Sequence, residues 1–91
     1  MKVHVRYVGL FAKYVGERER DFDLPDGATA DDLLGRLADQ YRETLPESFM
    51  DKETGRLHKS VRLATTGRAI GGEQELHDGD NLLVLFTLAG G

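Results

Sequence analysis

The chain has 91 residues, which is the length of one small domain. Its net charge of -4 disfavours non-specific binding to nucleic acid, because phosphates repel an acidic protein. It contains no cysteine, so disulfides, a thiolate nucleophile and a cysteine-ligated zinc site are excluded. No apolar run reaches the ~18–20 residues of a membrane span, and the start at Met1 shows no signal-peptide pattern. We therefore expect a cytoplasmic protein with neither a membrane nor a nucleic-acid partner.

The first part of the chain predicts a hairpin. Apolar and polar residues alternate over 2–8, which indicates a strand with Val3 and Val5 on the same face. Residues 10–15 form a short connection with apolar anchors, and residues 18–24 alternate again as a second strand.

A helix is predicted after the turn Pro25-Asp26-Gly27. Thr29 is a suitable N-cap, and Asp32 stands at the reciprocal position of a capping box. Apolar residues at helical spacing form one stripe, which consists of Ala30, Leu33, Leu34, Leu37, Ala38 and Tyr41. Pro46 ends the helical region.

The second half predicts a long polar connection and three strands. Residues 47–59 are polar, with Phe49, Met50 and Leu57 as anchors, and Leu76 is expected to enter the core from a turn. The strands follow at 61–66, at 69–70 and in the apolar run 82–88.

This order of elements indicates an α+β protein with one main helix across one face of a mixed sheet. The last strand is apolar on both faces, which is typical of a central strand. We expect it to lie parallel to the first strand, with the helix as part of the crossover.

The sequence ends in Gly90-Gly91. A frayed end needs no particular residue, whereas a tail that threads a narrow slot favours glycine, because glycine has no Cβ to meet the slot walls. Residues 87–91, if extended, would reach about 16 Å. Our hypothesis is that the working group is the carboxylate of Gly91, presented by a flexible Gly-Gly tail over about 87–91.

The last strand also predicts a docking surface. Alternate side chains would face the helix, and Leu83, Leu85 and Leu88 would face outward. An apolar patch on an open sheet face marks a partner surface. The predicted partner-binding residues are Leu83, Leu85, Leu88, Ala89, Val8 and Phe11. The alternative is that loop residues such as Phe11 or Phe49 cover these leucines.

Five segments, in order, resemble the β-grasp sulfur carriers and ubiquitin-like proteins of the MoaD/ThiS type. They are Val5-Arg6-Tyr7, Leu24-Pro25-Asp26-Gly27-Ala28-Thr29, Asp32-Leu33-Leu34, Asp78-Gly79-Asp80 and Ala89-Gly90-Gly91. MoaD-like members often carry Asn-Gly in place of Thr66-Gly67 and Pro-Pro in place of Phe86-Thr87. Leu57-His58, after a long polar loop, resembles the subgroup of CysO-type carriers and archaeal small modifiers.

The resemblance implies a single β-grasp domain over 1–91 that is a carrier and not an enzyme. An E1-like adenylyltransferase of the MoeB/ThiF type would use Mg-ATP to adenylate Gly91. A sulfur donor, a sulfurtransferase or cysteine desulfurase, would then yield a Gly91 thiocarboxylate. The leading acceptor is the large subunit of molybdopterin synthase, which would make this chain the small subunit in molybdenum or tungsten cofactor biosynthesis. No bound cofactor is expected.

Other functions stay open from the sequence. Sulfur could go to thiamine, cysteine or homocysteine synthesis, or Gly91 could be joined to target lysines as in a ubiquitin-like modifier. A plain interaction domain would tolerate loss of Gly91. The scattered residues His4, His58 and His77 lack ligand spacing, so no metal site is predicted.

Overall fold

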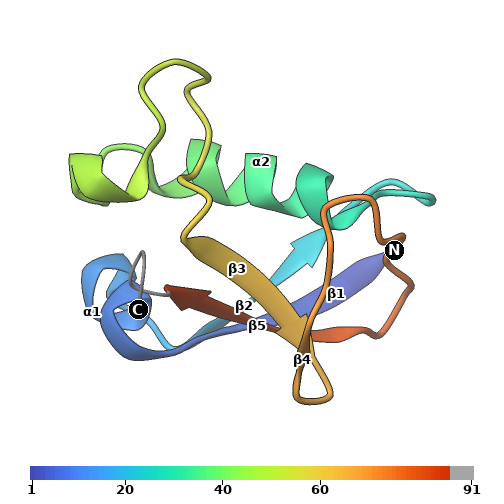
Figure 1. Cartoon of the computed structure of the whole chain (residues 1–91). Helices are drawn as coiled ribbons and strands as arrows, with labels where there is room; N and C mark the ends of the chain where they lie inside the picture. Colours follow the sequence, from blue (N-terminus) through green and yellow to red (C-terminus); the bar gives the residue numbers. More distant parts are fainter. Residues whose placement is uncertain (87–91) are drawn as a thin grey trace.

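The computed structural model describes residues 1–86, in which a long helix crosses one face of a mixed sheet (Figure 1). The predicted tail at 87–91 lies outside the described residues. In chain order the elements are β1 (Lys2–Tyr7), α1 (Gly9–Val15), β2 (Glu19–Asp23), α2 (Ala30–Tyr41), the 3-10 helix η1 (Glu47–Phe49), β3 (Val61–Thr65), β4 (Arg68–Ala69) and β5 (Asn81–Phe86).

The sheet has the order β2-β1-β5-β3-β4. β5 lies at its centre, parallel to β1 and antiparallel to β3, with Tyr7 opposite Val84 and Val61 opposite Phe86. The prediction of a central last strand beside the first is confirmed. Its alternate residues Leu82 and Val84 are buried on the side of the sheet that α2 covers, whereas Leu83 and Leu85 on the other side are half-buried.

The helix α2 forms as predicted. The Thr29 side chain accepts a hydrogen bond from the backbone of Asp32, and the Asp32 side chain accepts one from the backbone of Thr29, which completes the capping box. Such an N-cap contributes about 1 kcal/mol to stability. Leu33 and Leu37 are fully buried against the sheet, whereas Leu34 is only half-buried at the edge of the stripe.

The connection between β1 and β2 contains a helix that the sequence did not predict. α1 spans two turns between Gly9 at φ +63° and Gly16 at φ +84°, and Gly16 closes it in the left-handed conformation of a helix C-cap. Seven residues are too few for a helical period to stand out from a short apolar anchor.

Phe11 on α1 corrects one predicted site residue. Its side chain has no exposed surface and packs into the core beside Tyr7. Burial of this kind makes Phe11 a core residue, so its assignment to the partner-binding surface is wrong.

The long connection after α2 is folded against the core. Phe49 is buried, and the bridge between Met50 and Leu57 closes the segment into a hairpin-like loop. Asp51 caps the exposed turn, since its carboxylate accepts a hydrogen bond from the backbone of Glu53. Leu76 enters the core from its turn with 2% of its surface exposed, as predicted.

Candidate docking surface and carrier group

The face of the sheet opposite α2 carries the two predicted leucines of β5. Leu83 lies between Arg6 of β1 and Ala64 of β3, and Leu85 lies opposite Arg62 of β3. Residues opposite one another on paired strands share a face. Both leucines are half-buried, so each presents part of its side chain outward.

Val8 lies at the end of this apolar area, and α1, which contacts β5, carries further exposed apolar side chains. The exposed large hydrophobic side chains within residues 1–86 include Val8 at 38%, Leu10 at 46% and Tyr14 at 40%. The backbone amide of Val8 donates to the carbonyl of Val84, which places Val8 beside Leu85. Leu10 and Tyr14 are four residues apart on α1 and so share one helix face.

We call Leu83, Leu85, Val8, Leu10 and Tyr14 the docking surface. Leu10 and Tyr14 were missed from the sequence because the helix that aligns them was not predicted. The available signal was the apolar pair at i, i+4 between two glycines. Leu88 and Ala89, which were predicted to belong to this surface, lie outside the described residues, as do Gly90 and Gly91.

Phe11 and Phe49, the two residues that could have covered the outward leucines of β5, belong to the core. Phe11 and Phe49 are both buried within the main hydrophobic cluster. Phe49 stacks on Phe86, with ring centroids 4.2 Å apart and an angle of 7° between the planes. The leucines of β5 therefore keep their partial exposure, and the end of β5 rests on an aromatic ring.

A charged cluster lies on the same sheet face near the β2 edge. The two ring nitrogens of His4 lie 2.6 Å from a Glu19 oxygen and 2.7 Å from an Asp21 oxygen. The hydrogen bond to Asp21 is the largest effect on the pKa of His4; burial opposes it, and the hydrogen bond to Glu19 adds to it, so that the pKa is raised above its ordinary value of 6.5. With both ring nitrogens facing carboxylates, the imidazolium form satisfies the cluster best.

A chain of hydrogen bonds lies behind the docking surface, inside the core. Tyr41 donates to Glu17 over 2.7 Å, so Tyr7 donates to the hydroxyl of Tyr41 over 2.6 Å. Burial raises the pKa of Tyr7 to about 12 and raises that of Tyr41 as well. Both phenols are therefore neutral near pH 7, and these hydrogen bonds join β1, α2 and the segment before β2 without offering an acid or base.

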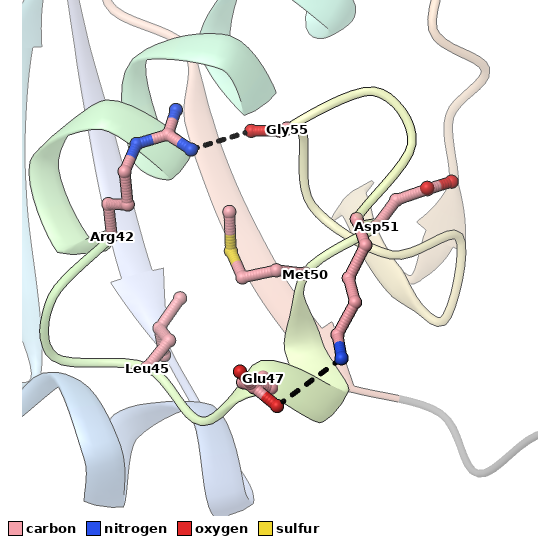
Figure 2. Close-up of a pocket in the computed structure, with 7 residues that line it drawn as sticks. Arg42, Leu45, Glu47, Met50, Asp51 and Gly55 are labelled. Atoms are coloured by element: carbon pink, nitrogen blue, oxygen red, sulfur yellow. Dashed lines mark hydrogen bonds and ion pairs between the residues drawn. The ribbon is translucent and has the colours of Figure 1, made fainter.

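A shallow groove lies between the end of α2 and the 51–55 turn (Figure 2). Leu45 and Met50 form its apolar floor. Arg42 donates to the carbonyl of Gly55 over 3.0 Å, and Lys52 lies 3.6 Å from a Glu47 carboxylate oxygen. Arg42 and Lys52 are therefore already paired with groups of the loop and its start. We interpret the groove as a structural contact that holds the loop to the helix, and not as a ligand site.

The part of the chain that the structure describes has no group of three or more histidine, aspartate or glutamate side chains placed to hold a metal ion. Neither of its α-helices is long and apolar enough to cross a membrane.

The match to a family model decides the classification. Residues 5–91 match the model of the ThiS family. The chain belongs to the ThiS family. The match covers almost the whole sequence and includes Gly90 and Gly91. This confirms the MoaD/ThiS-type family that the ordered motifs resemble.

Solved structures share the β-grasp fold of this ThiS-family chain. SAMP1 from Haloferax volcanii superposes with a TM-score of 0.78 at 22% identity, covering 100% of both chains. The ubiquitin of Caldiarchaeum subterraneum gives a TM-score of 0.62 at 18% identity, with 100% and 98% covered. At these identities the likeness shows the fold, which is the predicted ubiquitin-like β-grasp.

A putative molybdopterin converting factor, subunit 1, from Pyrococcus furiosus is similar at 28% identity. Its TM-score is 0.70, and the alignment covers 97% of this chain and 99% of that one. No curated protein matches the sequence of this ThiS-family chain.

Proposed function

We propose that this chain is a sulfur carrier whose Gly91 carboxylate is adenylated and then converted to a thiocarboxylate. The observation that carries the proposal is the ThiS-family match, which runs through the terminal Gly90-Gly91. The partly exposed apolar surface around the end of β5 supports it, because a carrier must hold its partner close to the tail.

The chemistry follows from the state of a free carboxylate. With a pKa of about 3.3–3.7 it is ionised near pH 7 and is a poor electrophile. A carboxylate oxygen of Gly91 would attack the α-phosphorus of ATP, forming an acyl-adenylate and releasing pyrophosphate. A hydrosulfide equivalent would then attack the carbonyl carbon, and AMP would leave with the electrons of the broken C–O bond. The carboxyl group thereby exchanges one oxygen for one sulfur.

The chain supplies presentation in this scheme, and its partners supply catalysis. An E1-like adenylyltransferase would bind Mg-ATP, and a sulfurtransferase or cysteine desulfurase would deliver sulfur. The docking surface would pack against an apolar face of the partner. Arg6 and Arg62, exposed on either side of the leucines, would meet carboxylates at the rim of that face.

The leading pathway is molybdenum or tungsten cofactor biosynthesis, with this chain as the small subunit of molybdopterin synthase. The 28% identity to the putative converting factor subunit supports it. In that role the acceptor enzyme is the large synthase subunit. Sulfur carriers for thiamine, cysteine or homocysteine synthesis would use the same Gly91 chemistry with another acceptor.

A ubiquitin-like modifier is the second candidate. The matches to archaeal modifier proteins fit the resemblance of the Leu57-His58 segment to that subgroup. A modifier would use the same acyl-adenylate but pass Gly91 to a lysine amine, forming an isopeptide bond. A carrier and a modifier share the adenylation step, so only the final product, a thiocarboxylate or an isopeptide, distinguishes them.

The test is the intact mass of the full chain purified from its native host, with the C-terminal peptide resolved. Replacement of one Gly91 oxygen by sulfur is the expected result. In vitro, the E1-like enzyme of the same organism with Mg-ATP and sulfide should form the thiocarboxylate.

A variant lacking Gly91 should fold but should not be adenylated, whereas Gly71→Ala should react normally because a Cβ at Gly71 meets open space. If the enzyme releases no pyrophosphate from ATP in the presence of the native chain, the proposal is contradicted. Branched lysine peptides bearing Gly91, with no thiocarboxylate, would favour the modifier.

A further inference from the structure

We propose that Phe49 is a positioning residue for the carrier group, because its ring holds Phe86 and so sets the point at which the chain leaves β5. The inference rests on the proposed function and adds to it the part of the fold that presents the tail.

The rings of Phe49 and Phe86 are stacked face to face. The centroids of Phe49 and Phe86 are 4.2 Å apart and the planes are within 7° of parallel. Phe86 is the last residue of β5 and lies opposite Val61 of β3. Its backbone is therefore held by pairing with β3, and its ring is held by stacking on Phe49.

Phe49 itself is firmly placed. Its exposed fraction is 3%, its ring stacks on Phe11 at 5.9 Å, and the ring of Tyr14 meets it edge-on at 5.5 Å. Through these contacts the exposed α1 part of the docking surface and the end of β5 rest on one ring. A partner that packs on Tyr14 would lie against the element that fixes the base of the tail.

The long connection after α2 holds Phe49 from the backbone. The amide of Phe49 donates to the carbonyl of Pro46 over 3.0 Å, and the carbonyl of Phe49 accepts from the amide of His58 over 2.7 Å. The bridge between Met50 and Leu57 continues this pairing. The connection thus holds the buried ring of Phe49 in place.

The sequence at the end of β5 explains why such a support is useful. Phe86 is followed by Thr87, so no proline ring presets φ at this point. Stacking restrains Phe86 by a different route, through its side chain. A restrained exit lowers the ordering cost of threading the tail into a partner, and losing that restraint weakens binding without touching the reacting atoms.

The test compares Phe49→Leu and Phe86→Leu with the matched control Phe22→Leu in the full chain. Phe22 is buried to a similar extent, with 4% exposed, but lies opposite Val3 at the other end of the sheet. Two quantities are measured: the amide order parameter of Phe86, and the KM and kcat for the carrier in ATP–pyrophosphate exchange by the E1-like enzyme.

We expect both stack variants to lower the order parameter of Phe86 and to raise KM by about 2- to 10-fold with kcat unchanged. Phe22→Leu should change neither quantity even where its loss of stability is as large. If Phe49→Leu does not fold, the half-buried Phe86→Leu decides the question.

The inference is overturned if the stack variants leave Phe86 order and KM as in the native chain, or if Phe22→Leu raises KM equally. A native chain that supports no exchange at all contradicts the proposed function instead. In that case the order parameters alone decide whether Phe49 restrains the end of β5.

Discussion

The hydroxyl oxygens of Tyr7 and Tyr41 lie 2.6 Å apart in the core, linking the first strand to the end of the long helix. Glu17, in the segment leading into β2, accepts a hydrogen bond from the hydroxyl of Tyr41 and another from Arg20 over 2.6 Å. The two buried hydroxyl groups therefore both have hydrogen-bond partners, and a polar group that is hydrogen-bonded can be buried at little cost in stability.

Tyr41→Phe should destabilise the protein by about 1–3 kcal/mol, because it leaves the buried hydroxyl of Tyr7 without its acceptor. The double variant Tyr7→Phe with Tyr41→Phe should lose less than the sum of the two single variants, since both partners are then apolar. Urea unfolding of the four proteins measures the coupling. Strict additivity would show that the two hydroxyls do not interact in solution.

His4 should make stability depend on pH. Its pKa is raised in the folded state, chiefly by Asp21, so its contribution is fully present below the unfolded value of 6.5 and is lost as pH rises through the folded pKa. The cluster is partly exposed, so the effect should stay below about 1 kcal/mol.

The measurement is the difference between urea unfolding free energies at about pH 5.5 and about pH 8.5, on either side of the ordinary histidine pKa. The native chain should gain stability toward the lower pH relative to His4→Gln, which carries no titrating group there. Equal pH dependence of the two proteins would show that His4 does not contribute to it.

Leu10→Asp should weaken activation while leaving the fold intact. Leu10 is 46% exposed on α1, so a carboxylate there costs little in the free chain. Within an apolar contact it would be desolvated, and a loss of the size of an interface hot spot corresponds to at least about a tenfold rise in KM. Gln40→Asp, which also adds a carboxylate at an exposed position but lies on α2 away from the docking surface, is the matched control and should keep the native KM. An unchanged KM for Leu10→Asp would remove α1 from the docking surface.

Gly72→Ala should destabilise the chain more than Gly71→Ala. A Cβ at Gly72 would overlap the carboxylate of Asp31 in the first turn of α2, whereas a Cβ at Gly71 meets open space. Overpacking of this kind costs about 1–3 kcal/mol, less where the side chain of Asp31 can turn away. Thermal unfolding of both variants tests this, and adding Asp31→Ala to Gly72→Ala should recover stability. No recovery would place the strain in the backbone of the 71–72 loop.

The elements that could be predicted are those whose signal is local. The capping box at Thr29 and Asp32, and the apolar stripe from Ala30 to Tyr41, lie within one stretch of chain and define α2 before any packing is known. The central place of β5 could be predicted because its apolar run includes both faces, which is typical of a strand with neighbours on both edges; α2 covers one of these faces, and the other stays half-buried.

The contacts that could not be predicted join residues far apart in the chain. Phe49 and Phe86, or Tyr7 and Tyr41, meet only once the sheet order brings their elements together. His4 reaches Glu19 and Asp21 only through the register of β1 with β2. The error at Phe11 has the same origin, because an apolar residue in a short connection can face the core or a partner.

By itself, the sequence determined the ubiquitin-like β-grasp fold, the main helix and the family, because periodicity, capping and ordered motifs are properties of neighbouring residues. Only the tertiary structure decided which apolar residues are exposed: it buried Phe11, left Leu10 and Tyr14 outward on α1, and set Phe49 beneath Phe86. Exposure depends on what packs against a side chain, and that is settled by the pairing of strands and the path of long connections across the whole domain.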